Sequence, residues 1–214
     1  MDLATIDYVL TTTHSVRKRL DLTRSVEPEV IERCIEIATH APTGGNRQGW
    51  HFLVVTDAAK RATIAEFYKQ SWDAYSAQRA SAPTEEWRAK QLNRVRDSAQ
   101  YLADHMHEVP VFIIPCIEGR AENAGAGAQA GLYGSILPAA WSLMLALRTR
   151  GLGSAWTTLH LAYEKQVAQL LGIPEHITQA ALLPVAYFTG NDFKVAQRLP
   201  AKERTYWDAW NARR

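Results

Sequence analysis

Apolar positions recur along the chain with two different periods, which predicts a domain that alternates helices and strands. Apolar residues three and four positions apart predict helices over Ile6–Thr13 and Pro28–Thr39. The nearly continuous apolar run His51–Thr56 predicts a buried strand, expected in the centre of the sheet. This alternation favours an α/β or α+β class with a small sheet. Further helices are expected over Ala58–Ala80, Glu85–His107 and Glu164–Leu171, and further strands over Val111–Ile117, Ser154–Thr158 and Ala180–Phe188.

The longest uncharged run, Ala124–Leu147, is interpreted as a buried helix rather than a membrane span. Gly119–Gly134 is expected to be a loop that leads into a helix ending at Arg150. The apolar core of the run, Ile136–Leu147, is too short to cross a bilayer. Because this segment is apolar on nearly every side, we expect it to be covered on all sides, partly by a second copy of the chain.

Composition and charge fit an ordinary globular protein. The chain has 214 residues, of which 47% are hydrophobic and 21% charged, so we expect one domain over residues 1–214. A helical excursion around Ser81–Asp97 and a C-terminal tail over 189–214 would belong to it. The net charge of +2 gives no reason to expect a nucleic-acid or membrane surface. Two cysteines, Cys34 and Cys116, indicate buried thiols in a reducing compartment, and hence a cytoplasmic protein.

Three short segments carry candidate chemistry. The basic turn His14–Arg19 places cations beside the Ser15 hydroxyl, which suits a phosphate monoester, although a solvated charged turn has the same composition. The loop Ala41–Trp50 has adjacent glycines and two amides that suit the edge of a heteroaromatic ring, or a self-bonded turn. Gly151–Thr158 brings small residues and free backbone donors to the start of a strand, or forms a plain turn.

Other kinds of site are not indicated by the sequence. His105 and His107 lie two apart, so they face different sides of a helix, and no third metal ligand stands at a suitable spacing. Cys34 and Cys116 have no neighbouring base that would activate a nucleophile. We therefore expect no metal and no catalytic side chain from the protein itself.

The segments together resemble the FMN-dependent nitroreductase family. The resemblance rests on Ser15-Val16-Arg17, Ala41–Trp50, Gly151–Thr158 and Leu171–Pro174 in this order, and it covers about residues 5–200. It implies an α+β nitroreductase-like fold, with a small mixed or antiparallel sheet flanked by helices. It also implies an intertwined homodimer with two FMN molecules at the interface.

The resemblance also implies roles for individual residues. Ser15 and Arg17 would bind the FMN phosphate and ribityl chain, with Arg198 arriving from the tail at the same phosphate. Most members have arginine where this chain has Thr13 or His14, so one phosphate cation is missing or replaced by His14. The other subunit would cover the flavin with Pro42, Thr43, Gly44 and Asn46, place Gln48 near it and add a polar contact from Ser135. Trp156 and Thr157 would pack against the isoalloxazine, and the Thr158 N–H would reach its N5 region.

The implied activity needs no nucleophile, because the flavin carries the hydride chemistry. NADH or NADPH would reduce the flavin, which would then reduce a nitroaromatic, a quinone or a similar flat small molecule in a ping-pong cycle. Two alternatives stay open. One is a protein that sequesters flavin or senses redox state without steady turnover, and the other is a specialised member that fragments flavin, dehalogenates or oxidises a peptide.

Overall fold

The computed structural model describes residues 2–78, 85–191 and 193–214, which form two compact units. The larger unit contains residues 14–190. The smaller unit combines α1 (Leu3–Thr12) with the tail that follows Gly190, which is irregular apart from one 3₁₀ turn, Ala201–Glu203. The expectation of one domain over residues 1–214 stays a prediction.

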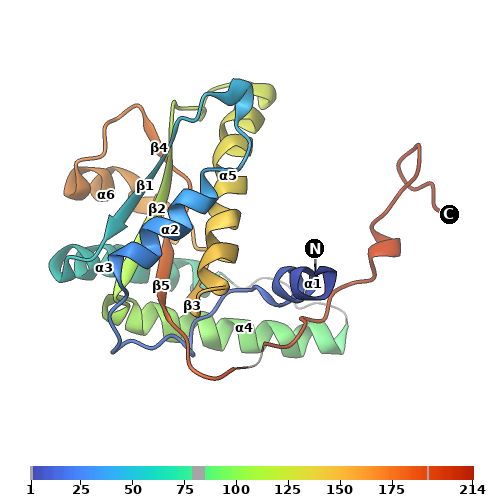
Figure 1. Ribbon diagram of the computed structural model, residues 1–214, viewed down its shortest axis with the longest axis horizontal. Coiled ribbons are helices and arrows are strands. Elements are labelled where there is room, and N and C mark those ends of the chain that lie inside the picture. Colours follow the sequence, from blue (N-terminus) through green and yellow to red (C-terminus); the bar gives the residue numbers. More distant parts are fainter. Residues whose placement is uncertain (1, 79–84, 192) are drawn as a thin grey trace. The chain divides into compact units, whose positions relative to one another are not determined.

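The larger unit is an antiparallel sheet flanked by helices, which confirms the α+β class (Figure 1). The strand order is β1-β2-β5-β3, and the short strand β4 pairs with the C-terminal end of β2. The strands are β1 (Trp50–Val55), β2 (Val111–Glu118), β3 (Leu152–Ser154), β4 (Ile177–Gln179) and β5 (Leu183–Tyr187). The helices of this unit are α2 (Pro28–Ala38), α3 (Ala58–Ala77), α4 (Glu86–His105), α5 (Ala126–Arg148) and α6 (Glu164–Leu171).

Two helices have the bounds that their local signals predict. Pro28 occupies the first turn of α2, where its missing N–H costs nothing. Gly172 ends α6 in the left-handed conformation at φ 70°, which glycine adopts without strain. Of the predicted excursion Ser81–Asp97, residues 81–84 lie outside the described residues, and the rest from Glu86 onward belongs to α4.

The strand β1 corrects an expectation, because it lies at an edge of the sheet rather than in its centre. Within the described chain β1 pairs with β2 alone, through Trp50↔Ile117 to Val55↔Phe112. Val54 is 37% exposed. A continuous apolar run indicates that both faces of a strand are covered. It does not indicate whether both edges of the strand are hydrogen-bonded to neighbouring strands.

The last two predicted strands also differ from the structure. The strand expected over Ala180–Phe188 is shortened to β5, and a separate strand, β4, comes before it; the two pair with β2 on either side of Pro115. Proline has no N–H to donate, so the ladder is interrupted at that position. The strand expected over Ser154–Thr158 stops at Ser154, and Thr157 forms only an isolated bridge with Leu182.

Helix α5 begins at Ala126, so most of the loop expected over Gly119–Gly134 is helical. Glycine and alanine both occur in this segment, and the glycines that indicated a loop carry only a modest helix penalty of about 1 kcal/mol each. α5 is long and apolar enough to cross a membrane by length and composition alone. It packs against α2, β2 and β3, and Leu143 and Leu147 are fully buried there.

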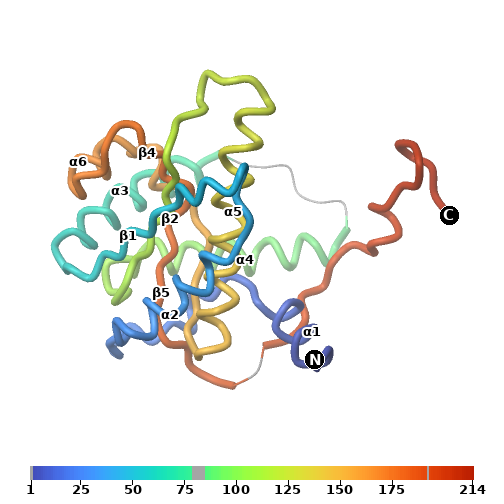
Figure 2. The backbone as a smooth tube through the Cα atoms, turned by 45° about the horizontal axis from the view of Figure 1, so that its top comes forward, coloured from blue at the N-terminus to red at the C-terminus, as the bar shows by residue number. Residues whose placement is uncertain are grey.

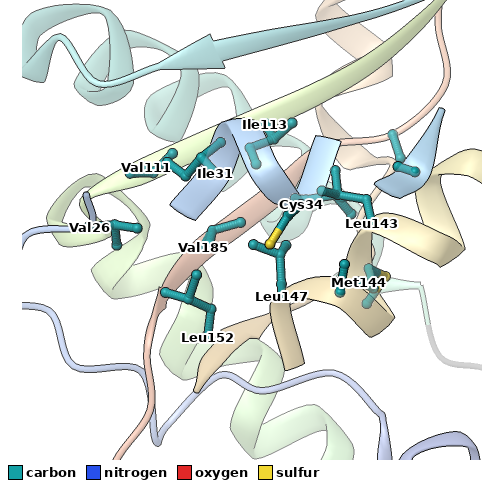
Figure 3. Packing of buried hydrophobic residues seen from close by; sticks show 14 residues of the cluster. Val26, Ile31, Cys34, Val111, Ile113, Leu143, Met144, Leu147, Leu152 and Val185 are labelled. Atoms are coloured by element: carbon teal, nitrogen blue, oxygen red, sulfur yellow. The ribbon is translucent and has the colours of Figure 1, made fainter. Parts of the chain in front are cut away.

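The main core lies where α2 and α5 cover one face of the sheet. Figure 3 shows Ile31 and Cys34 of α2 facing Leu143 and Leu147 of α5, with Val185 of β5 beneath them. In the tube view, α3 and α4 run on the other side of the strands (Figure 2). The candidate site is built on that second side, where α3 meets the segment after β3.

Candidate functional site

The basic turn is held against β3 by a close backbone approach. The Val16 N–H donates to the Ser154 carbonyl oxygen at 2.9 Å. A Cβ atom on Gly153 would lie only 2.9 Å from the Cβ of Val16, so only glycine fits at this position. The contact fixes Arg17 beside the segment that leaves β3, and this segment carries Trp156, Thr157 and Thr158.

Arg17 and residues 156–158 line one cavity of about 940 Å³. The structure therefore brings together four of the residues singled out in the sequence. The remaining walls come from α3, from α4 and from Leu159. The lining residues from α3, from Gln78 directly after it and from α4 are Tyr68, Trp72, Tyr75, Ser76, Gln78, Leu92, Val95, Arg96, Asp97, Ala99 and Gln100.

Arg17 presents an uncompensated positive charge to this cavity. Its side chain is partly buried, and its hydrogen-bond partner in the described structure is the Ser98 hydroxyl, 3.4 Å from Nη1. Burial lowers the pKa of the Arg17 guanidinium, but arginine keeps its charge in proteins. No carboxylate of the described residues forms an ion pair with it. A partly buried cation of this kind is suited to an anionic ligand.

His14 and Ser15 lie on the same turn, half-buried, without lining the cavity. The His14 Nδ1 is 3.4 Å from the Ser15 carbonyl oxygen. Both side chains are thus at the margin of the Arg17 cavity rather than in its wall. Their expected role toward a phosphate stays a prediction.

The loop Ala41–Trp50 forms a second cluster with α5. The Gly44 N–H donates to the Ser135 hydroxyl at 3.0 Å, and the Gln48 N–H donates to Thr43 Oγ1 at 3.1 Å. The Gln48 amide also donates to Asn46 Oδ1 at 3.1 Å. Asn46 and Gln48 both have φ 53°, an uncommon conformation for residues other than glycine. The loop is therefore a defined, self-bonded structure tied to α5.

The two clusters do not share a cavity within one chain. Pro42 lines a different groove, of about 500 Å³, beside α5, and Thr43, Gly44, Asn46, Gln48 and Ser135 are absent from the walls of the Arg17 cavity. Arg198 belongs to the smaller unit, where it is exposed and its Nη1 donates to the Gln197 carbonyl oxygen. Its expected place beside the phosphate stays a prediction.

The aromatic side chains that α3 contributes to the cavity wall were not predicted from the sequence. Tyr68, Trp72 and Tyr75 recur at helical spacing and line the cavity together. The Trp72 indole N–H donates to Gln100 Oε1 at 2.7 Å, which fixes the ring between α3 and α4. The i, i+4, i+7 spacing was a usable signal, but it looks the same in a helix that faces an apolar core.

The thiols and the histidines offer no competing chemistry. Burial raises the pKa of Cys34, and it raises the pKa of Cys116 to about 12, so neither thiol is a ready nucleophile. His105 bonds Glu108 at 2.5 Å on the surface. Across the described residues there is no group of three or more His, Cys, Asp or Glu side chains placed to hold a metal ion.

His160, which follows the cavity segment, should make the fold sensitive to acid. Its ring is fully buried, and neither nitrogen has a hydrogen-bond partner among the described residues. Burial lowers its pKa to about 4, against about 6.5 in an unfolded chain. In that pH range the unfolded state binds the extra proton, so the free energy of unfolding falls as the pH falls.

His160→Gln should therefore flatten the pH dependence of stability, by up to about 3 kcal/mol between pH 6.5 and pH 4. Urea unfolding across this range measures the effect, with the exposed His176→Gln as the matched control. An unchanged pH dependence in His160→Gln would show that the ring is protonated as easily in the folded state as in the unfolded state.

The fold defines an α+β protein with a small antiparallel sheet, next to which lies a cavity lined by a partly buried arginine. A sequence model of the Nitroreductase family matches residues 10–187. The chain therefore belongs to the nitroreductase family, as the motifs predicted.

Two curated relatives show the range of this family. The chain is 28% identical over 164 residues to iodotyrosine deiodinase 1 of Mus musculus, covering 76% of this chain and 55% of that protein. It is 30% identical over 140 residues to 5,6-dimethylbenzimidazole synthase of Rhodospirillum rubrum, covering 63% of this chain and 60% of that protein. The chain thus spans less than two thirds of either relative.

Solved structures agree on the fold. The FMN-dependent nitroreductase NfnB from Mycobacterium smegmatis, in complex with NADPH, has a TM-score of 0.70 at 22% identity, covering 97% of this chain and 100% of that chain. Iodotyrosine deiodinase bound to FMN and 3-iodo-L-tyrosine has a TM-score of 0.69 at 22% identity, covering 90% and 95%. At these identities the likeness establishes the nitroreductase fold.

Proposed function

We propose that the chain is an FMN-dependent oxidoreductase that uses NADH or NADPH to reduce nitroaromatics, quinones or similar flat acceptors. The observation that carries this proposal is the cavity of about 940 Å³, which is lined by Trp156, by an aromatic wall and by Arg17, a cation with no carboxylate partner among the described residues. The residues fit FMN, because its phosphate and its planar ring require a cation and flat apolar surfaces.

This chain's side chains would bind and orient the cofactor. Arg17, with Ser15 and His14 from the same turn, would hold the ribityl and phosphate end, and Arg198 would join them from the tail. Trp156 and Thr157 would pack against the ring, while the Thr158 backbone N–H would donate to it. When bound, the flavin supplies the hydride transfer, and the protein excludes water and positions the acceptor.

We further propose that each FMN site is completed by a second copy of the chain. Pro42, Thr43, Gly44, Asn46, Gln48 and Ser135 cannot reach the Arg17 cavity of their own chain as wall residues. α5, which carries Ser135, also exposes large apolar side chains along one stripe. These are Tyr133, Leu137 and Trp141, which are 37%, 36% and 38% exposed. Apolar area of this kind supports a two-fold homodimer across α5.

Anaerobic spectroscopy tests the function. The purified protein should be yellow and release about one FMN per chain on heating, and NADH or NADPH should bleach the visible flavin band. Addition of a nitroaromatic or quinone acceptor should then restore the band. FAD, or no chromophore after reconstitution, would contradict the assignment.

The same experiment separates the alternatives. A flavin-sequestering or redox-sensing protein would bind FMN without sustained NAD(P)H oxidation in the presence of an acceptor. A dehalogenating member would convert a halogenated phenol and leave a nitroaromatic unchanged, a possibility raised by the deiodinase relative. We propose a cytoplasmic protein with no nucleic-acid or membrane partner, on the basis of its balanced charge and free buried thiols.

A further inference from the structure

Tyr68 of α3 occupies the same cavity as Arg17, although no sequence motif includes it. Tyr68 is only 3% exposed, yet it lines the cavity. Arg17 and Tyr68 both line the cavity, and the positive charge of Arg17 offsets part of the rise that burial causes in the pKa of Tyr68. Two polar groups from segments far apart in the sequence thus meet in this cavity.

The Tyr68 hydroxyl makes no hydrogen bond within the residues that the structure describes. The contrast with Tyr163 is informative, because the Tyr163 hydroxyl donates to Gln70 Oε1 at 2.8 Å. Buried phenols normally find a partner, so the Tyr68 hydroxyl is available for one that enters the cavity.

The chemistry of the pair selects the kind of ligand group. Arginine can only donate hydrogen bonds, and its partner Ser98 uses its own proton on the Val95 carbonyl oxygen at 2.9 Å. Burial raises the pKa of Tyr68 to about 12, so the phenol stays protonated and can donate at neutral pH. Arg17 and Tyr68 thus add one charged and one neutral donor to a cavity wall that also includes Arg96 and Asp97, and such a pair of donors suits an anionic acceptor.

We propose that Tyr68 donates a second hydrogen bond to the anionic group that Arg17 binds. The inference rests on the proposed function, in which this group belongs to FMN. A negatively charged acceptor can come from two parts of FMN: the ribityl phosphate, or the pyrimidine edge of the ring when the reduced flavin is anionic.

Tyr68→Phe tests the inference, because it removes the hydroxyl and keeps the ring. The matched control is Tyr101→Phe, which makes the same change on the neighbouring helix α4 at a position outside the cavity wall. Apoprotein is titrated with FMN and with riboflavin, which lacks the phosphate, and quenching of flavin fluorescence gives each dissociation constant. Melting temperatures of the apoproteins verify that both variants fold.

Tyr68→Phe should weaken FMN binding by about ten-fold or more, as expected for a hydrogen bond to a charged group, and Tyr101→Phe should leave it unchanged. Loss with FMN alone identifies the phosphate as the acceptor. Loss of the same size with riboflavin, together with a lower midpoint potential of the bound flavin, identifies the ring edge.

Unchanged binding of both flavins and an unchanged midpoint potential in Tyr68→Phe would overturn the inference, and so would equal losses in Tyr68→Phe and Tyr101→Phe. A wild-type protein that binds neither flavin would overturn the proposed function and the inference with it. The wild-type titration therefore tells the two failures apart.

Discussion

Replacing Arg17 with alanine should weaken FMN binding by about ten- to a hundred-fold. Arg17 is a partly buried cation in the wall of the cavity that Trp156 also lines, and its hydrogen-bond partner in the described structure is Ser98 at 3.4 Å. A hydrogen bond to a charged group contributes roughly 1.5–3 kcal/mol, which converts to this change in affinity. Equilibrium titration of the apoprotein with FMN measures it.

Arg94→Ala is the matched control for Arg17→Ala, because Arg94 is an exposed arginine of α4 that does not line the cavity. It should leave the dissociation constant for FMN unchanged. Equal affinity in wild type and Arg17→Ala would mean that the basic turn is a solvated surface, the alternative that its composition leaves open.

Trp141→Glu should separate the proposed dimer and release FMN in the same step. Trp141 is 38% exposed on the α5 stripe with Leu137 and Tyr133. An interface that covers this stripe would bury the glutamate charge without a partner, and tryptophans at the centre of interfaces contribute about 2 kcal/mol or more. The dissociation constant of the dimer should therefore rise at least about thirty-fold.

Sedimentation velocity with detection at the flavin band follows both quantities at once. Ala62→Glu, which adds the same charge at an exposed position of α3, should leave the dimer and its FMN intact. A Trp141→Glu protein that sediments as a stable monomer and still carries FMN would refute both the interface on α5 and the shared site.

Local signals in the sequence predicted the elements whose ends are set locally. Pro28 marks the start of α2, and Gly172 marks the end of α6 in the left-handed conformation. The errors arose where pairing decides the outcome. β1 is nearly all apolar, yet it pairs with another strand along only one edge in the described chain. β2 pairs with two separate strands, β4 and β5, on either side of Pro115. The period of apolar residues along a strand does not reveal how its edges pair.

The candidate site was predictable where it consists of contiguous motifs. Arg17 and residues 156–158 converge because Gly153 lets the turn at Val16 approach β3 to 2.9 Å. Tyr68 and Trp72 were not predicted as site residues, because their position in the cavity wall depends on how α3 packs against α4. An aromatic stripe on a helix has the same spacing whether it faces a cavity or a core.

The claim that one FMN site is built from two copies of the chain is tested most directly by mixing two defective variants. One carries Arg17→Ala, and the other carries Asn46→Ala with Gln48→Ala. In a mixed dimer, one site takes Arg17 from the second variant and the loop from the first, so both parts are intact. We predict that co-expressed mixed dimers bind about one FMN per two chains with wild-type affinity, while each parent binds FMN weakly. Mixed dimers that bind FMN no better than their parents would contradict a shared site and place each cofactor within a single chain.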